Sequence, residues 1–200
     1  MTRVVPIELA RGPVRLQPLL PEHAQGLAEA AAAADGELWR LWFTSVPEPG
    51  SEAAYIATAL HMQANGQCLP FVVLDAASGA VIGSTSYHDI LPTVQRLEIG
   101  YTWYARRCQR SAVNTTCKWL LMQHAFATLG AQVVGWCTDG VNFPSQRAVK
   151  RLGALKDGVI RHHALRREGS VRDTVMYSMT VAEWPASRAR LESALAARQG

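Results

Sequence analysis

A strand, a short basic turn and a long helix between residues 97 and 129 constrain the fold of this chain more than any other stretch. Residues 97–104 alternate apolar and other side chains with the two-residue period of a β-strand. We expect the apolar set to face the core, and it consists of Leu97, Ile99, Tyr101 and Trp103. From residue 113 the apolar side chains recur with the period of a helix instead. These positions are Val113, Cys117, Leu120, Leu121, Ala125 and Leu129.

The turn between this strand and this helix is basic. It carries Arg106, Arg107 and Arg110 immediately before the helix begins. The backbone N–H groups at a helix start are unpaired and bear a partial positive charge. The local pattern therefore fits a phosphate or pyrophosphate site. The alternative is a solvated basic turn in front of a core helix.

Around this unit the pattern predicts the element order β-α-α-β-β-β-α-β-α-β-β-α. Strands are expected at 14–18, 69–75, 80–90, 97–104, 132–138, 156–166 and 172–181. Helices are expected at 21–34, 51–65, 113–129, 142–152 and 182–197. Residues 1–12 are interpreted as a lead-in, and Trp39, Trp42 and Phe43 are expected to pack onto the core. The prediction is a single α/β (α+β) domain over residues 1–200, with its core at about 14–181. Its sheet is mixed and mostly antiparallel, with helices on both faces.

Composition excludes several classes of protein. Apolar residues make up 48% and charged residues 18%, which is typical of a globular domain. The net charge of +4 suits an anionic ligand such as a nucleotide cofactor but is too small to indicate nucleic acid. The cysteines, namely Cys68, Cys108, Cys117 and Cys137, form no Cys-x-x-Cys pair, and no histidine has a metal-like spacing from them. We therefore expect free thiols in a reducing cytoplasm and no metal site. With no signal-peptide pattern and no long apolar run, we expect no membrane partner.

The basic turn resembles the phosphate loop of the GCN5-related N-acetyltransferases (GNAT), which reads Arg/Gln-x-x-Gly-x-Gly/Ala. Arg107 matches its first position and Ala112 its last, whereas Arg110 replaces the middle glycine. Glycine lets the backbone approach a pyrophosphate closely. Arg110 must therefore point outward or substitute its guanidinium for part of that contact.

Other segments resemble the same family in the same order. LEIGYTWY at 97–104 resembles its fourth strand, and HAFATLGA at 124–131 resembles the end of its central helix. NFPSQRAVKRLGA at 142–154 is similar to its Asn-x-x-Ser…Leu-Gly motif. The pairs Arg172-Asp173 and Glu183-Trp184 are similar to the RimJ/RimL-like branch. The resemblance covers about residues 14–181 and implies the GNAT fold.

The resemblance also implies an activity, the transfer of an acetyl group from acetyl-CoA to a primary amine. In the family the amine attacks the thioester directly, and the pantetheine arm lies between the strands that correspond here to 97–104 and 132–138. Backbone N–H groups of residues 108–113 are expected to meet the pyrophosphate. The expected cofactor-binding residues are Trp103, Tyr104, Arg107, Cys108, Gln109, Arg110, Ser111, Ala112, Val113, Asn114, Asn142 and Ser145.

Two residues are predicted to be catalytic. Glu98 is the only acidic residue of strand 97–104, and it alternates opposite the apolar set. We predict that it acts as the general base, directly or through water; the alternative is a surface carboxylate paired with Arg96 or Arg106. Ser145 is predicted to donate a proton or hydrogen bond to the leaving sulfur. Capping of the helix by Asn142 is the alternative role for this motif.

His124, His162 and His163 are not expected to act in catalysis. His162 and His163 are adjacent on a strand and should point to opposite faces. His124 and Trp119 are interpreted as surface or packing residues of the long helix.

Two other functions stay open. The first is a catalytically inactive CoA-binding sensor or interaction module, which the loss of the glycine at Arg110 would favour. The second is a nucleic-acid binder that uses the arginines of the turn, although we expect no nucleic-acid partner; steep salt dependence of binding would reveal it. The acceptor amine, a protein N-terminus or a small molecule, and the existence of a homodimer are likewise open.

Overall fold

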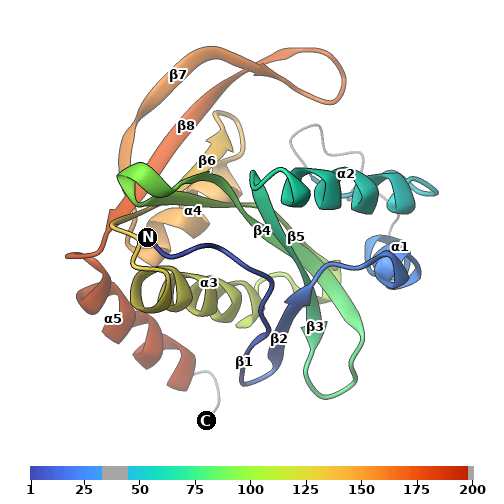
Figure 1. Ribbon diagram of the computed structural model, residues 1–200, viewed down its shortest axis with the longest axis horizontal. Helices are drawn as coiled ribbons and strands as arrows, with labels where there is room; N and C mark the ends of the chain where they lie inside the picture. Colours follow the sequence, from blue (N-terminus) through green and yellow to red (C-terminus); the bar gives the residue numbers. More distant parts are fainter. Residues whose placement is uncertain (33–44, 198–200) are drawn as a thin grey trace.

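The computed structural model describes residues 1–32 and 45–197 of the 200-residue chain. Trp39, Trp42 and Phe43 lie outside the described residues. One eight-stranded sheet has the order β1-β2-β3-β4-β5-β6-β8-β7 (Figure 1). Its strands are β1 (Leu9–Arg11), β2 (Val14–Pro18), β3 (Cys68–Asp75), β4 (Val81–Leu91), β5 (Arg96–Tyr104), β6 (Val133–Asp139), β7 (Leu155–Leu165) and β8 (Val171–Thr180).

The helices cover both faces of this sheet (Figure 1). They are α1 (Ala24–Ala32), α2 (Glu52–Ala64), α3 (Val113–Gln123), α4 (Phe143–Leu152) and α5 (Trp184–Ala196). Helices α3, α4 and α5 pack on one face, and α1 and α2 pack on the other. Among the described residues, no helix is both long and apolar enough to cross a membrane.

The predicted mixed sheet with helices on both faces is confirmed. Among the paired strands, only β5 and β6 run parallel. Strand β3 shows why its sequence is a continuous apolar run. Phe71 and Val73 face the α3 side, whereas Val72 and Leu74 face α1 and α2, so both faces of the strand are buried.

Two predictions at the N-terminal end of the chain need correction. The lead-in contains strand β1, which pairs antiparallel with β2. Its three residues are too short to show a period in the sequence. The first helix begins with a 3₁₀ turn at Pro21–His23 and is described as far as Ala32, so its predicted end at residue 34 lies outside the described residues. Proline fits this turn because its missing N–H is not needed there.

A β-bulge in β5 overturns the predicted faces of its second half. Three steps along β5, from Gly100 to Trp103, match two along β4, from Ser86 to Ser84. Tyr101, at the extra position, has φ of 48° and is 45% exposed, so its predicted place in the core is wrong. Beyond the bulge the alternation reverses. Trp103 therefore packs with α1 and α2, on the face opposite Leu97.

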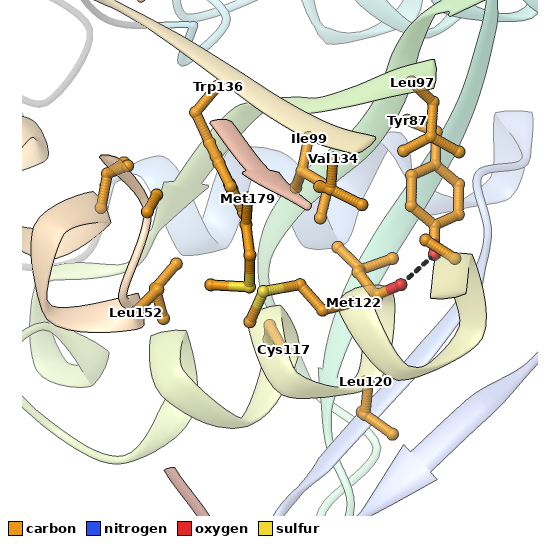
Figure 2. Packing of buried hydrophobic residues seen from close by; sticks show 14 of the residues in the cluster. Tyr87, Leu97, Ile99, Cys117, Leu120, Met122, Val134, Trp136, Leu152 and Met179 are labelled. Atoms are coloured by element: carbon orange, nitrogen blue, oxygen red, sulfur yellow. Dashed lines mark hydrogen bonds between the residues drawn. The ribbon is translucent and has the colours of Figure 1, made fainter. Parts of the chain in front are cut away.

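The core beneath α3 fixes the position of this helix against the sheet. Cys117, Leu120 and Met122 belong to the same buried cluster as Leu97 and Ile99 of β5 (Figure 2). The Tyr87 hydroxyl donates a 2.6 Å hydrogen bond to the carbonyl of Leu121 (Figure 2). The helix then continues as a π-helix, His124–Thr128, rather than as the regular helix that we predicted to residue 129. Anchored in this way, α3 presents its N-terminal end beside the end of β5.

Candidate active site

Strands β5 and β6 pair over three positions and then separate. Their last register pair is Glu98 with Gly135. Beyond it β5 continues to pair with β4, and β6 continues to pair with β8. We call this point the β5–β6 fork. Past the fork, the facing backbone edges of residues 99–104 and 136–139 have no ladder partner among the described residues, so they can bind a ligand that carries amide groups.

The basic turn lies between β5 and α3. A 3₁₀ turn at Arg106–Cys108 uses the N–H groups of Cys108 and Gln109 internally, to Ala105 O and Arg106 O. These two N–H groups are thus engaged within the turn, which leaves the other N–H groups of the predicted set for a pyrophosphate. Ser111 supports the start of α3, because its hydroxyl accepts a hydrogen bond from Val113 N–H at 3.2 Å and donates one to Cys108 O at 2.6 Å.

Other backbone N–H groups of the turn remain able to donate a hydrogen bond to a ligand. Within the described part of the chain, the N–H groups of Ser111, Ala112 and Asn114 have no backbone acceptor. Arg107 and Arg110 are exposed. Arg110 has φ of 60°, in the left-handed region where glycine is most at ease. The backbone thus keeps the shape of a glycine position, while the side chain adds a charge.

Glu98 lies where β5 and β6 stop pairing. It is 5% exposed, and Arg96 Nη2 donates to its Oε1 at 3.1 Å. The predicted alternative of a carboxylate paired with Arg96 is right in its partner and wrong in its surface location. The other oxygen, Oε2, is buried and accepts no hydrogen bond from a nitrogen or oxygen donor of the described residues, while the Cys137 thiol lies next to the carboxylate. A buried carboxylate oxygen without such a donor is costly, which is common where function requires it.

His88 and Cys137 lie beside Glu98, and the sequence analysis identified neither. His88 of β4 is the register partner of Glu98. One ligand atom from each of His88, Glu98 and Cys137 lies within 4.8 Å of the other two. Burial, followed by the negative charge of Glu98, raises the pKa of the Cys137 thiol to about 11. The hydrophobic period of one segment cannot predict this cluster, because its three residues lie on three different strands.

The cluster is held by its neighbours. The carboxylate of Asp89 lies 2.9 Å from His88 Nδ1, and this hydrogen bond lowers the pKa of Asp89. The rings of His88 and Tyr101 meet edge to face at 5.0 Å. Gly100 and Gly135 make room, since a methyl group on Gly100 would overlap His88 Nε2 and one on Gly135 would lie 2.7 Å from Arg96 Nη2.

Lys118 is a second buried group that the sequence analysis missed. Its Nζ donates to Thr85 Oγ1 at 3.1 Å and to Thr102 Oγ1 at 2.5 Å, beneath the strand that forms the fork. Burial lowers its pKa from 10.5 to about 7. The two threonine hydroxyls are also 2.8 Å from each other.

Helix α4 begins just after β6. Asn142 Oδ1 accepts a hydrogen bond from Ser145 N–H at 3.1 Å, so the predicted N-cap is present, and Gly153 ends the helix with φ of 102°. The asparagine side chain is thus engaged in capping. Ser145 is half-buried on the first turn.

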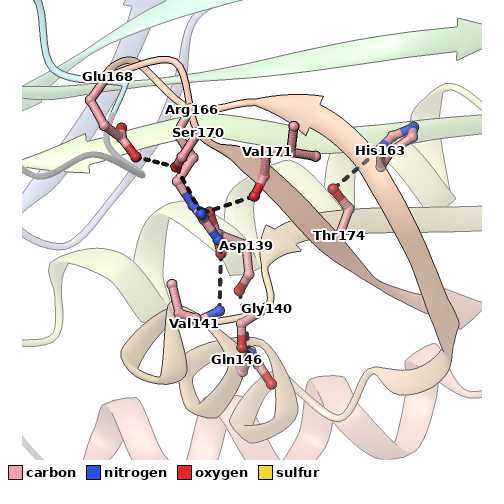
Figure 3. A network of polar contacts seen from close by, with 10 residues as sticks. All are labelled: Asp139, Gly140, Val141, Gln146, His163, Arg166, Glu168, Ser170, Val171 and Thr174. Carbon is pink, nitrogen blue, oxygen red and sulfur yellow. Dashed lines mark hydrogen bonds and ion pairs between the residues drawn. The ribbon is translucent and has the colours of Figure 1, made fainter.

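An ion-pair network fixes the β6–α4 junction against the β7–β8 hairpin (Figure 3). Arg166 Nε donates to Asp139 Oδ2 at 2.7 Å, and Val141 N–H donates to Asp139 Oδ1 at 3.0 Å. Burial alone would raise the pKa of Asp139, but these partners outweigh it and hold the pKa below its usual range. Gln146 Nε2 donates to Gly140 O at 2.9 Å and closes the network (Figure 3).

An open surface depression of 330 Å³ lies between the first turns of α2 and the loop that joins β7 to β8. Tyr55 on its wall donates to Ser84 Oγ at 3.3 Å, and Ser84 pairs with Trp103 of β5. Arg167 closes the other side and donates to Val46 O at 2.6 Å. The lining residues are Pro47, Glu48, Ser51, Ala54, Tyr55, Thr58 and Arg167.

His124, His162 and His163 lie outside the β5–β6 fork, and the contacts of His124 and His163 are with neighbouring side chains. His124 is buried within 3.2 Å of the Tyr87 hydroxyl, and burial lowers its pKa. It is therefore a packing residue, one of the two roles expected for it. His163 Nδ1 lies 3.0 Å from Thr174 Oγ1, and His162 has φ of 54°.

Comparison with known proteins identifies the family. Residues 14–155 match the model described as an acetyltransferase (GNAT) domain, so the chain belongs to the GNAT acetyltransferases. A comparison with curated proteins finds no match.

Solved structures share the same fold. A GCN5-related N-acetyltransferase from Brucella melitensis is 29% identical with a TM-score of 0.86, over 97% of this chain and 87% of that one. A T. thermophilus protein assigned as an acetyltransferase is 32% identical with a TM-score of 0.82, over 96% and 98% of the two chains. Mycobacterium smegmatis RimJ, solved with CoA-disulfide, is 18% identical with a TM-score of 0.78 over 96% of each chain, which shows a common fold.

Proposed function

We propose that this protein transfers the acetyl group of acetyl-CoA to a primary amine. One observation carries the proposal: the β5–β6 fork lies next to the basic turn at the start of α3. The fork offers unpaired backbone edges for the amide groups of the pantetheine arm. The turn offers Arg107, Arg110 and free N–H groups for the pyrophosphate. Acetyl-CoA supplies the activated thioester.

In this proposal Glu98 accepts the proton of the acceptor amine. An alkylammonium has a pKa of about 10, so the amine arrives protonated and must lose a proton before it attacks the acetyl carbon. Glu98 has one oxygen held by Arg96 and one that accepts no hydrogen bond from a nitrogen or oxygen donor of the described residues, at the place where the fork opens. As the amine nitrogen bonds to the acetyl carbon, the carbon–sulfur bond breaks and the leaving sulfur takes up a proton. Ser145, on the first turn of α4, is the proposed donor of that proton or of a hydrogen bond.

The geometry of Arg110 removes the observation that favoured an inactive CoA-binding module. That alternative rested on the missing glycine of the phosphate loop. The left-handed backbone at Arg110 supports a loop that retains the path a glycine would give it.

Release of free CoA thiol over a panel of amines tests the proposed function. The panel contains peptides with free N-termini, which the resemblance to the RimJ/RimL-like branch favours, together with polyamines, amino acids and aminoglycosides. Turnover with any member supports acetyl transfer. Saturable acetyl-CoA binding with no turnover across the panel would instead support the inactive module.

Glu98→Gln measured with a substrate from that panel tests the proton acceptor. We expect kcat to fall by about 10²–10⁴-fold near neutral pH. Activity should partly recover toward pH 10, because the amine then loses its proton to solvent. An unchanged kcat and pH profile would assign the role to water or to the substrate.

A further inference from the structure

We propose that His88, Glu98 and Cys137 form a zinc-type metal site at the β5–β6 fork, and that an ion bound there inhibits acetyl transfer. The sequence predicts no metal site, because no histidine has a metal-like spacing from a cysteine along the chain. The sheet register brings these three residues together from β4, β5 and β6.

The three side chains share one face of the sheet. His88 and Glu98 are direct cross-strand partners, and Glu98 pairs with Gly135, two residues before Cys137. Their ligand atoms lie within 4.8 Å of one another. Zinc bonds of about 2.0–2.3 Å hold tetrahedral ligands roughly 3.3–3.8 Å apart, so closure by about 1 Å suffices. Side-chain rotation can supply that movement.

The nearest neighbours already orient the candidate ligands as in a metal site. The Asp89 carboxylate lies 2.9 Å from His88 Nδ1, so this nitrogen is engaged and Nε2 is the nitrogen left for an ion. Arg96 holds one oxygen of Glu98. The other oxygen of this carboxylate is buried and accepts no hydrogen bond from a nitrogen or oxygen donor of the described residues, and the Cys137 thiol lies next to the carboxylate, so a cation could bind between the two groups.

The charges and the ligand types favour zinc. A thiolate, an imidazole and a carboxylate form a donor set that zinc binds well, with a fourth position for water. Magnesium and calcium prefer sites made only of oxygen. On binding, the Cys137 thiol gives up its proton to solvent. The charges of Glu98, Asp89 and the thiolate then balance those of Arg96 and a divalent ion.

The proposal connects to function through Glu98. An ion coordinated by this carboxylate prevents it from accepting the proton of an amine. Zinc and the acceptor amine should therefore compete at the fork. The existence of the site does not depend on the proposed activity, because metal binding can be measured without CoA or an amine.

The experiment measures Zn²⁺ binding by the full chain against a chromophoric chelator, and Co²⁺ binding by absorption spectroscopy. The wild type should bind one Zn²⁺ ion, and Co²⁺ should give a thiolate-to-metal charge-transfer band. Cys137→Ser and His88→Asn should lose both signals. Asp89→Asn, which keeps all three ligands, should weaken binding by about 10–100-fold. Cys108→Ser and His61→Asn, which alter a thiol and an imidazole outside the cluster, should bind like the wild type.

Circular dichroism shows whether each variant is folded, and only folded variants are compared for metal binding. Folded Cys137→Ser protein with wild-type affinity and stoichiometry would overturn the site, as would a wild-type protein that gives no charge-transfer band. Binding that is lost in Cys137→Ser while acetyl transfer stays insensitive to Zn²⁺ would overturn the inhibition. If no amine is ever acetylated, the binding results still decide whether the site exists.

Discussion

Replacing Lys118 with methionine should stabilise the protein and remove part of its pH dependence. The ammonium group of Lys118 is buried between α3 and the sheet, where Thr85 and Thr102 are its hydrogen-bond partners. Methionine has a similar length and no charge. After the substitution the two threonine hydroxyls can still bond to each other, since they already lie 2.8 Å apart.

The cost of burying the charged Lys118 side chain follows from the shift of its pKa. The difference between 10.5 and about 7 corresponds to roughly 5 kcal/mol, because each pKa unit is worth about 1.4 kcal/mol. Between these two pH values the unfolded chain binds more protons at this lysine than the folded chain does. Stability therefore rises with pH across that window, and the full penalty applies below pH 7. The substitution also removes hydrogen bonds worth about 1–3 kcal/mol. We therefore expect Lys118→Met to raise the free energy of unfolding by about 2–4 kcal/mol at pH 6.

Urea unfolding from pH 6 to pH 9.5, followed by circular dichroism, measures this effect. The stability of the wild type should approach and then meet that of Lys118→Met as the pH rises. Lys150→Met, at an exposed position of α4, is the control and should keep the wild-type slope. Parallel curves for the wild type and Lys118→Met would show that the lysine carries no burial penalty and would refute the reasoning.

Two further predictions concern the cofactor site. Arg107→Glu combined with Arg110→Glu should weaken CoA binding at least tenfold in calorimetry, since two charge-assisted contacts of about 1.5–3 kcal/mol each are lost; Arg151→Glu on α4 is the charge-matched control, and an unchanged affinity would remove the turn from the site. Ser145→Ala should lower kcat more than about threefold if Ser145 assists the leaving sulfur, whereas Asn142→Ala should lower the free energy of unfolding by about 1 kcal/mol through the lost cap. A smaller effect of Ser145→Ala would leave capping as the role of this motif.

Local sequence was sufficient for the elements and for the basic turn. The two-residue period of strands and the 3.6-residue period of helices reflect which side chains a neighbouring layer can bury. These periods located β2 to β8 and the starts of the helices to within a few residues. The cap of α4 was predictable as well, because Asn142 and Gly153 act on backbone groups within one turn of themselves. The resemblance of the loop at Arg107 to a known motif directed attention to the N-terminal end of α3, where the N–H groups of Ser111, Ala112 and Asn114 have no backbone acceptor among the described residues.

The faces of β5 required the tertiary structure. A strand keeps its alternation only while every residue has a partner, and the extra residue at Tyr101 is visible only in its pairing with β4. This bulge moves Trp103 to the side of α1 and α2, and it directs Thr102 toward Lys118. Nothing in the sequence of β5 alone shows that such a residue is present.

The centre of the site was also decided by tertiary structure. Glu98 could be selected from its own strand, but His88 and Cys137 reach it through the register of β4 and β6. Lys118 is buried because α3 lies across Thr85 and Thr102, which belong to different strands. The sequence by itself determined which segments form strands and helices, since those preferences act over a few neighbouring residues. Only the tertiary structure decided which polar groups meet, because strand register depends on contacts between distant segments.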